Sequence, residues 1–380
     1  MGLRVNEGKG GSMRKRWMVV GLLTALVATV AVTASTATAS RKLTNISIQL
    51  QWVPQAQFAG YYAALDLGYY KAAGLNVKLL NGGPQIVPGQ VVAAGRAQFG
   101  VNWLTALLAA RDTGTQLVDI AQVFSRSGMT ELTWKSSGIS TVAQMKGKKV
   151  ANWLGGDQYE LFAALTKNGM DPAHNKGVTI VQQPFDMGLF LNHQVDAASA
   201  MTYNELAQVL ETKNPKTGKL YTLNDLNVIK MQNVGTGMLE DNLFSTASYL
   251  ASKAHQQIAE KVIGATLAGW IYCRDHVTQC VSFTLKAGPT LPRGHQMWMM
   301  NQINQLIWPS TTGIGIMDKA SYDRTWKLMK EFGGIKKAPT AGAYRTDLAV
   351  AAVAGLKKQG LDVYGKSYKP LNVKVTAGGK

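Results

Sequence analysis

The sequence has few of the residues that most metalloproteins and many enzymes depend on. It holds only two cysteines and five histidines in 380 residues, and the histidines are dispersed along the chain. No group therefore has the close His and Cys spacing of a metal site. The sequence also lacks a G-x-S-x-G elbow, a Walker sequence and an H-E-x-x-H motif;. We predict no metal, no cofactor and no catalytic residue.

Acidic residues are scarce as well. Asp and Glu number 22 against 40 Lys and Arg, which gives a formal net charge of +18. Such a balance first suggests nucleic acid or an anionic surface as partner. The basic residues form no long block, however, and no zinc-finger or RNP spacing occurs. We therefore expect no nucleic-acid partner and interpret the charge as a basic exterior facing polyanionic envelope polymers.

The only long apolar run is near the N-terminus. It covers residues 17–32, follows the basic residues 14–16, and precedes the small residues 37–39. This order is typical of a secretory signal peptide, and we predict cleavage after Ala39. The run is shorter than the ~20 residues of a membrane-spanning helix. No cysteine near the cleavage point could carry a lipid, so we expect a free protein in the periplasm or cell-wall space, with translation starting at Met1 or Met13.

Cys273 and Cys280 both lie in the part that would be exported. In one continuous helix they would be about 10 Å apart, which is too far for a disulfide. Residues that favour a helix start lie between them, and a break there could bring the sulfurs together;. Because exported cysteines are usually oxidised, we predict a disulfide between them.

Strand and helix patterns alternate along the chain after the apolar run. With 46% hydrophobic and 16% charged residues, the chain can bury a large core and fits two domains;. Alternating strands and helices predict mostly parallel sheets covered on both faces. The first α/β unit has predicted strands at 46–52, 75–80, 97–101 and 117–124, and the second at 149–153, 178–182 and 197–202. Helices dominate from residue 247 onward, at 247–287, 296–306, 322–332 and 344–358;.

Five stretches carry a resemblance to a known family. QWVPQAQFAGYYAALDLGYYKAAGLNVKLL at 51–80 resembles the opening of the NMT1/THI family of extracytoplasmic solute-binding proteins. IAQVFSRSGM at 120–129, MKGKKVANWLGG at 145–156, DAASAMTYNEL at 196–206 and MLEDNLF at 238–244 fit in the same order. The resemblance implies an α/β type II periplasmic-binding-protein fold, in which two α/β lobes close over a ligand cleft about a hinge. It also implies an ABC permease and its cytoplasmic ATPase as partners of a monomeric binder.

The lobe boundaries follow from the places where the chain would cross between the two units. We expect lobe 1 to comprise residues 40–127 with 240–380, and lobe 2 to comprise residues 128–239, after a signal peptide at 1–39. Gly128, Gly235 and Gly237 lie near the crossovers. Glycine accommodates the backbone changes that a hinge requires.

Ligands of open α/β sheets lie beyond the carboxyl ends of the strands, so residues just after each predicted strand are the site candidates. Aromatic rings recur there beside amides and carboxylates, the combination that suits a flat heteroaromatic ligand with an amino or imide edge. The candidate ligand-binding residues are Trp52, Gln57, Tyr61, Asn102, Trp103, Trp153, Gly155, Gly156, Asp157, Tyr159, Glu160, Tyr203, Asn204, Glu205, Glu240 and Asp241.

The ligand classes within the resembling family place different demands on these residues. A thiamine-pyrimidine precursor or a riboflavin-like ring fits the rings and carboxylates. A sulfonate or taurine-type anion would use the Gly155–Gly156 helix start with Arg126 and Ser127, but nearby acids would repel it;. We expect the heteroaromatic ligand. A basic envelope-associated scaffold without a small ligand is a third hypothesis.

A eukaryotic branch of the resembling family makes the thiamine pyrimidine with a lysine-bound pyridoxal phosphate. Leu65 and Leu67 stand where that branch has lysines, and its cysteine-rich iron motif is absent. A Schiff base requires an amine, which leucine lacks. We therefore expect a binding protein rather than an enzyme.

Overall fold

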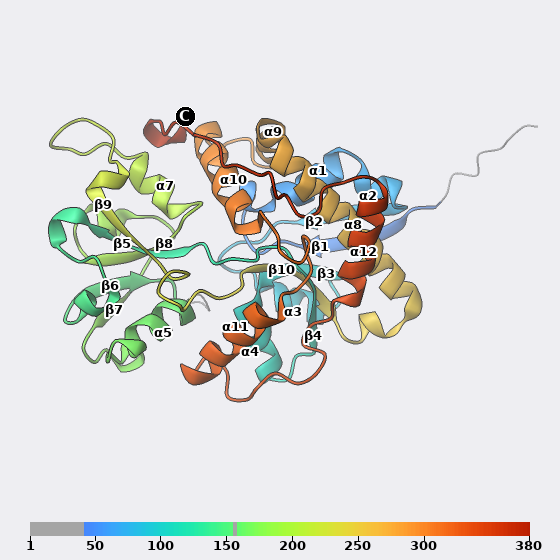
Figure 1. Cartoon of the computed structure of the whole chain (residues 1–380), viewed down its shortest axis with the longest axis horizontal. Helices are drawn as coiled ribbons and strands as arrows, with labels where there is room; N and C mark the ends of the chain where they lie inside the picture. Colours follow the sequence, from blue (N-terminus) through green and yellow to red (C-terminus); the bar gives the residue numbers. More distant parts are fainter. Residues whose placement is uncertain (1–41, 155–157) are drawn as a thin grey trace, which may run out of the picture. The chain divides into compact units, whose positions relative to one another are not determined.

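The strands of the protein form two separate five-stranded sheets (Figure 1). The computed structural model describes residues 42–154 and 158–380, and residues 42–380 pack as one unit. The first sheet has the order β2-β1-β3-β10-β4. Its strands are β1 (Thr44–Gln49), β2 (Leu75–Leu80), β3 (Phe99–Trp103), β4 (Leu117–Gln122) and β10 (Asp241–Thr246).

The second sheet has the order β7-β6-β8-β5-β9. Its strands are β5 (Met129–Trp134), β6 (Lys149–Asn152), β7 (Thr179–Gln182), β8 (Ala197–Met201) and β9 (Leu226–Lys230). The two sheets with their helices form the two lobes of an α/β fold, as the sequence predicts.

Each sheet contains one strand that runs against the other four. In the first sheet β10 is antiparallel to both of its neighbours, β3 and β4. In the second sheet β5 is antiparallel to β8 and β9. The remaining pairings, β1 with β2 and β3 and β6 with β7 and β8, are parallel. The chain therefore enters the second sheet through one reversed strand and returns to the first through another, and neither strand was among those predicted.

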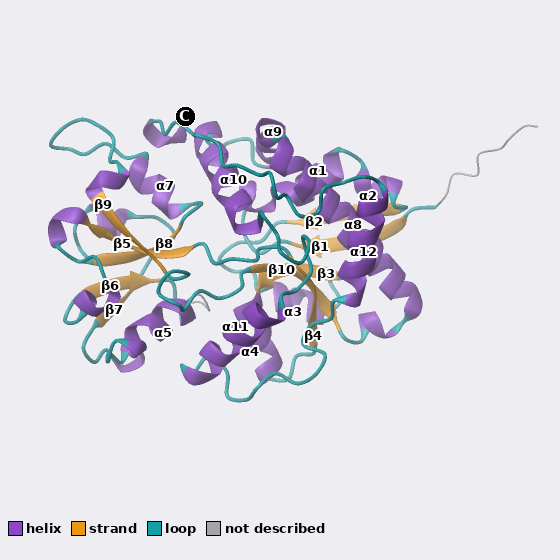
Figure 2. Cartoon of the chain, viewed as in Figure 1, coloured by secondary structure: helices purple, strands orange, loops and turns teal. Residues whose placement is uncertain are grey.

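Helices lie around both sheets (Figure 2). This covering explains why β3 and β4 are buried along their whole length and why β4 carries apolar residues on both faces;. The helices are α1 (Ala59–Asp66), α2 (Tyr69–Ala72), α3 (Pro88–Ala93), α4 (Leu104–Asp112), α5 (Tyr159–Lys167), α6 (Gly188–Leu191), α7 (Glu205–Leu210), α8 (Lys253–Asp275), α9 (Val277–Ala287), α10 (Arg293–Ile307), α11 (Lys319–Glu331) and α12 (Asp347–Lys358). Within the described ranges, none of them is long and apolar enough to cross a membrane.

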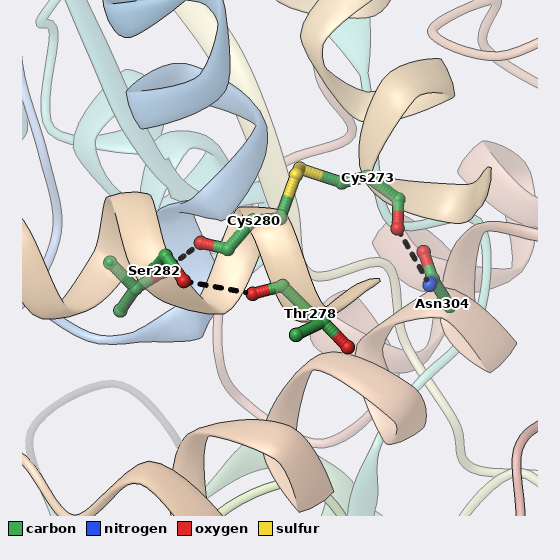
Figure 3. The surroundings of a disulfide bond; sticks show 6 residues. Cys273, Thr278, Cys280, Ser282 and Asn304 are labelled. Carbon is green, nitrogen blue, oxygen red and sulfur yellow. Dashed lines mark hydrogen bonds between the residues drawn. A yellow bond between two sulfur atoms is a disulfide. The ribbon is translucent and has the colours of Figure 1, made fainter. Parts of the chain in front are cut away.

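The predicted helical region 247–287 is divided at His276, between α8 and α9. The break brings the Cα atoms of Cys273 and Cys280 within 5.4 Å, and their sulfurs are joined in a disulfide (Figure 3). Both cysteines are buried. The amide of Asn304 on α10 donates to the carbonyl oxygen of Cys273 at 3.4 Å, so a third helix also contacts this corner.

Replacing Cys273 and Cys280 by serine should lower the free energy of unfolding by about 2 to 3 kcal/mol, because the disulfide reduces the number of conformations that the unfolded chain can adopt. Urea denaturation of the oxidised protein and the double variant measures this difference. Mass spectrometry without reductant should find the two residues in one linked peptide, whereas two alkylatable thiols in the native protein would contradict the bridge.

Candidate functional site

A cavity of about 490 Å³, including the part open to solvent, lies among the strand ends of both sheets. Its lining comes from the last residues of β3 and β8 and from the segments after β1, β6, β7 and β8. The lining residues are Gln51, Trp52, Gln55, Gln57, Trp103, Trp153, Phe185, Met201, Tyr203, Asn204 and Glu205.

Among the described residues, five aromatic rings line this cavity, two from the first lobe and three from the second. Trp52, just after β1, contacts Phe185 edge to face, with ring centroids 4.5 Å apart. This contact joins the two lobes at the cavity. Trp153 is held after β6 by a hydrogen bond of 3.2 Å from its indole nitrogen to the carbonyl oxygen of Pro184. Tyr203 packs edge to face against Phe124, with ring centroids 6.4 Å apart. The rings offer flat apolar surfaces of the kind on which a planar ligand stacks.

A chain of amides leads from the cavity to a buried acid at the start of β10. Gln57 donates to both carboxylate oxygens of Asp241, at 3.0 and 3.1 Å. The amide oxygen of Gln57 accepts in turn from Gln55 at 2.6 Å. Gln55 and Gln57 line the cavity, whereas Asp241 lies behind them. Burial raises the pKa of Asp241 to about 7, and hydrogen bonds from Gln57 and Trp103 act in the opposite direction.

This raised pKa predicts a pH-dependent loss of stability that replacing Asp241 by asparagine should remove. The unfolded chain loses the Asp241 proton near its ordinary pKa of 3.8, whereas the folded protein keeps it to about 7. The free energy of unfolding therefore falls as pH rises through this interval. We expect the free energy of unfolding of D241N, relative to that of wild type, to increase by roughly 3 to 4 kcal/mol between about pH 4 and pH 8.

Urea denaturation at a series of pH values measures this difference. Asp171→Asn is the matched control. A hydrogen bond from His174 lowers the pKa of this exposed acid, so Asp171 changes the pH dependence of stability only below about pH 4;. A constant difference between D241N and wild type across the interval would show that Asp241 is ionised throughout.

Two polar side chains at the start of α7 face the other side of the cavity. Glu205 is buried and accepts a hydrogen bond from the backbone N–H of Met201 at 2.9 Å. Asn204 donates its side-chain amide to the second oxygen of Glu205 at 2.7 Å. The end of β8 thus fixes a carboxylate and an amide at the cavity, where they can accept hydrogen bonds from amino or imide groups.

A second pair of acids lies where the chain crosses between the sheets. Glu240 accepts from the backbone N–H of Gly128 at 2.5 Å, and Glu160 on α5 accepts from the hydroxyl of Ser127 at 2.7 Å. Burial and the nearby Glu160 raise the pKa of Glu240 well above its usual range. Neither acid lines the cavity. Their hydrogen bonds join the segment at residues 127–128 to residue 240, where the chain returns to the first sheet, and to α5 of the second lobe. Both acids therefore lie at the predicted hinge.

The structure brings seven of the predicted site residues together at the cavity: Trp52, Gln57, Trp103, Trp153, Tyr203, Asn204 and Glu205. Tyr61 is instead 1% exposed in the core, edge to face with Trp270. Asn102 and Tyr159 line a separate groove beside α3 and α4. Gly155, Gly156, Asp157 and the predicted signal peptide lie outside the described residues.

Four lining residues were not predicted. Gln51 and Gln55 flank Trp52, Met201 ends β8, and Phe185 follows β7. Phe185 is 49% exposed, although its side chain is large and apolar. The rule that selects residues after strand ends would have found it, since the strand predicted at 178–182 ends three residues before it.

The alternative anion site has little support among the described residues. The guanidinium of Arg126 donates to main-chain oxygens of α10 and the residues that follow it, including Pro309 at 2.5 Å. The hydroxyl of Ser127 is directed to Glu160. The described cavity lining contains no Arg, Lys or His. An anion there would meet the buried Glu205 without a compensating cation.

Comparison with known proteins places these features in a family. A family model described as NMT1/THI5 like matches residues 55–279, more than half of the chain. A formylaminopyrimidine-binding protein of Halalkalibacterium halodurans is 23% identical over 47% of this chain and 58% of its own. The riboflavin-binding protein RibY of Chloroflexus aurantiacus is 22% identical over 78% of this chain and 83% of its own. Some curated relatives are thus matched over only about half of their length.

Among solved structures, the alkanesulfonate-binding protein SsuA of Xanthomonas axonopodis pv. citri bound to MOPS is similar to this chain. The identity is 16%, the match covers 80% of this chain and 99% of that one, and the TM-score is 0.58. At this identity the likeness concerns the fold alone.

Proposed function

Because this chain belongs to the NMT1/THI5-like family, we propose that it is the extracytoplasmic solute-binding component of an ABC importer. Its ligand is a small flat heteroaromatic molecule, a thiamine-pyrimidine precursor or a riboflavin-like ring. The two lobes close over the ligand and present it to a membrane permease, which a separate cytoplasmic ATPase drives. The binder acts as a monomer without a cofactor.

The observation that carries this proposal is the composition of the cavity. Rings from both lobes, Trp52 and Trp103 on one side and Trp153, Tyr203 and Phe185 on the other, surround the same space as the polar side chains of Asn204 and Glu205. Rings bind the faces of a planar molecule, and oxygens accept hydrogen bonds from its amino edge. Since both lobes contribute walls, a ligand would hold them together.

The names of two relatives agree with this ligand class. One is a formylaminopyrimidine-binding protein and the other a riboflavin-binding protein, and both names specify nitrogen-bearing rings. The sulfonate-binding neighbour is the reason to test an anion as well. The buried carboxylate of Glu205 and the absence of a cationic side chain from the described lining count against that alternative.

A pyrimidine-synthase activity is the other alternative. It would need a lysine amine for pyridoxal phosphate. Leu65 and Leu67 occupy the corresponding positions at the end of α1, away from the cavity, and Leu65 is exposed. We propose a binding role in place of this chemistry.

The cellular setting is part of the proposal. We propose that residues 1–39 direct export and are removed, and that the protein acts in the periplasm or cell-wall space. The lobe boundaries at 40–127 with 240–380 and at 128–239 are proposed as well. The division of the strands between two sheets supports them, because β5 follows residue 128 directly and β10 begins at residue 241.

Thermal unfolding of the purified mature protein tests the function. A ligand that binds only the folded state raises its stability by RT ln(1 + [L]/Kd). We expect a rise with a thiamine pyrimidine or riboflavin and none with taurine or pyridoxal phosphate. A rise with taurine alone would favour the anion alternative, turnover of any compound would favour an enzyme, and no response to a broad panel would favour an envelope scaffold.

A further inference from the structure

One face of α10 contacts the part of the second lobe that supplies the cavity's polar groups. The indole N–H of Trp298 donates to the carbonyl oxygen of Thr202 at 2.9 Å, just after β8. One helical turn earlier, the two ring nitrogens of His295 face different partners. Nδ1 lies 2.9 and 3.1 Å from the carboxylate oxygens of Glu211, and Nε2 lies 3.0 Å from Oδ1 of Asn204. His295 therefore contacts both ends of α7 at once.

The hydrogen bonds around Asn204 determine the protonation of His295. The side-chain nitrogen of Asn204 donates to Glu205 at 2.7 Å, so its oxygen is the atom that faces His295. The reverse orientation would direct that oxygen at the Glu205 carboxylate. Nε2 of His295 must then carry a proton, and with an ionised Glu211 carboxylate as its partner Nδ1 must carry one as well. A neutral imidazole has only one N–H, so the complete arrangement requires the imidazolium form.

The pair is shielded from solvent by the C-terminal segment. His295 and Glu211 are each 9% exposed. The backbone N–H of Gly378 donates to the carbonyl oxygen of Glu211 at 3.0 Å. A Cβ atom on Gly379 would lie 2.7 Å from Cβ of His295 and 3.0 Å from Oε1 of Glu211, so only glycine fits there. This burial strengthens the electrostatic interaction between a charged ring and the Glu211 carboxylate, since little water is available to screen it.

Three other charged residues of the described chain are related to the ring. Glu205 is linked to it through Asn204. Arg293 precedes it by two residues on α10, and Lys380 follows Gly379 in the covering segment. Because Glu211 is the charged group in direct contact with the ring, loss of the proton would leave this carboxylate without its counter-charge.

We propose that the His295 imidazolium is a positioning residue of the cavity, which joins α10 to Asn204 and Glu211 when the two lobes are closed. In this arrangement it fixes the Asn204 amide with its N–H toward Glu205 and its oxygen toward His295. Lobe closure brings both acceptors, Asn204 and Glu211, to the ring, so closure favours the protonated form of the ring. By thermodynamic reciprocity, protonation of the ring favours closure. Loss of the ring's proton at higher pH therefore weakens ligand binding. The affinity part of this proposal rests on the proposed binding function.

The first test needs no ligand. Nitrogen NMR of protein labelled at histidine should show two protonated ring nitrogens for His295 in mildly acidic buffer, and the Asn204 side-chain amide signal should shift in step as pH is raised. Glu211→Gln is the informative variant, because the new amide can donate to Nδ1 of a neutral ring whose Nε2–H still serves Asn204. In E211Q the Asn204 signal should lose its pH dependence but keep its position. A neutral ring in the wild type, or an Asn204 signal that ignores the titration, would overturn the proposal.

The second test measures riboflavin affinity against pH. We expect the dissociation constant of the wild type to rise about tenfold between about pH 5.5 and pH 8.5, and that of E211Q to change little. His174→Ala is the matched control, since His174 pairs with Asp171 on an exposed surface remote from the cavity. If the affinity of E211Q depended on pH as that of wild type does, or if H174A lost this pH dependence, the role of His295 would be contradicted. Absence of riboflavin binding at any pH would count against the proposed ligand, while the NMR result still decides on His295.

Discussion

Replacement of Trp52 by alanine should abolish the rise in melting temperature that a bound heteroaromatic compound produces. Trp52 lines the cavity and its ring contacts Phe185 of the other lobe, so the truncation removes a stacking surface and a contact between lobes together. A ring that stacks on a bound base contributes about 1 to 3 kcal/mol, which corresponds to a loss in affinity of up to about a hundredfold. Isothermal titration with the compound that gives the thermal shift measures the loss.

The unliganded protein should tolerate this change. Trp52 is only partly buried, at the edge of the core, so W52A should cost about 1 to 3 kcal/mol of folding stability;. Trp52→Phe is the control, because it keeps a ring at the site and should retain most of the affinity. Tyr203→Ala tests the facing wall and should abolish binding too, at a larger stability cost since Tyr203 is fully buried. Unchanged affinity in both alanine variants would show that the ligand binds elsewhere.

The convergence of these residues on one cavity could be predicted because it follows from sheet topology. Trp52, Trp103, Trp153 and Tyr203 come from four different strand ends and are as many as 151 positions apart in sequence, yet they line one cavity. Parallel strands present their carboxyl ends at one edge, so residues just beyond those ends converge whatever their separation along the chain. No periodicity or composition argument would have joined these four positions.

The predicted residues that lie elsewhere show what strand ends alone do not specify. Asn102 and Trp103 are neighbours at the end of β3, and successive residues of a strand point to opposite faces. Trp103 therefore faces the cavity while Asn102 lines the groove beside α3 and α4. Tyr61 lies on α1 with its ring in the core, because the packing of that helix against α8 decides which side is buried. Side-chain direction depends on such tertiary contacts.

The two reversed strands were not predicted because polar residues interrupt their buried apolar residues. β5 contains Thr130, Glu131 and Thr133, all fully buried, so it shows no apolar run. The hydroxyl of Thr130 donates to the carbonyl oxygen of Ala200 at 2.8 Å, and Glu131 is bonded to the hydroxyl of Ser199. Hydrogen bonds across the sheet, which the local sequence does not reveal, make such burial tolerable. β10, with Asn242 and Ser245 buried, has the same character.

Replacement of Gly269 by alanine should strongly destabilise the contact between α1 and α8. A Cβ atom on Gly269 would lie 2.0 Å from the carbonyl oxygen of Gly60 and 2.9 Å from the backbone nitrogen of Ala64. These are main-chain atoms, so the clash cannot be relieved by a side-chain rotation and the helices must separate. We expect G269A to lower the free energy of unfolding by about 3 kcal/mol or more, measured by urea denaturation.

Gly264→Ala, on the same helix, is the matched control and separates the clash from helix propensity. The nearest atom to a Cβ on Gly264 is Cβ of Ala352 at 3.8 Å, an ordinary contact. Alanine is the better helix former, so G264A should leave stability unchanged or raise it by up to about 1 kcal/mol. Equal effects of the two substitutions would show that α1 and α8 are not in close contact. Since α1 begins two residues after Gln57, movement of this helix in G269A should also disturb the Gln57–Asp241 hydrogen bonds and weaken ligand binding in the protein that remains folded.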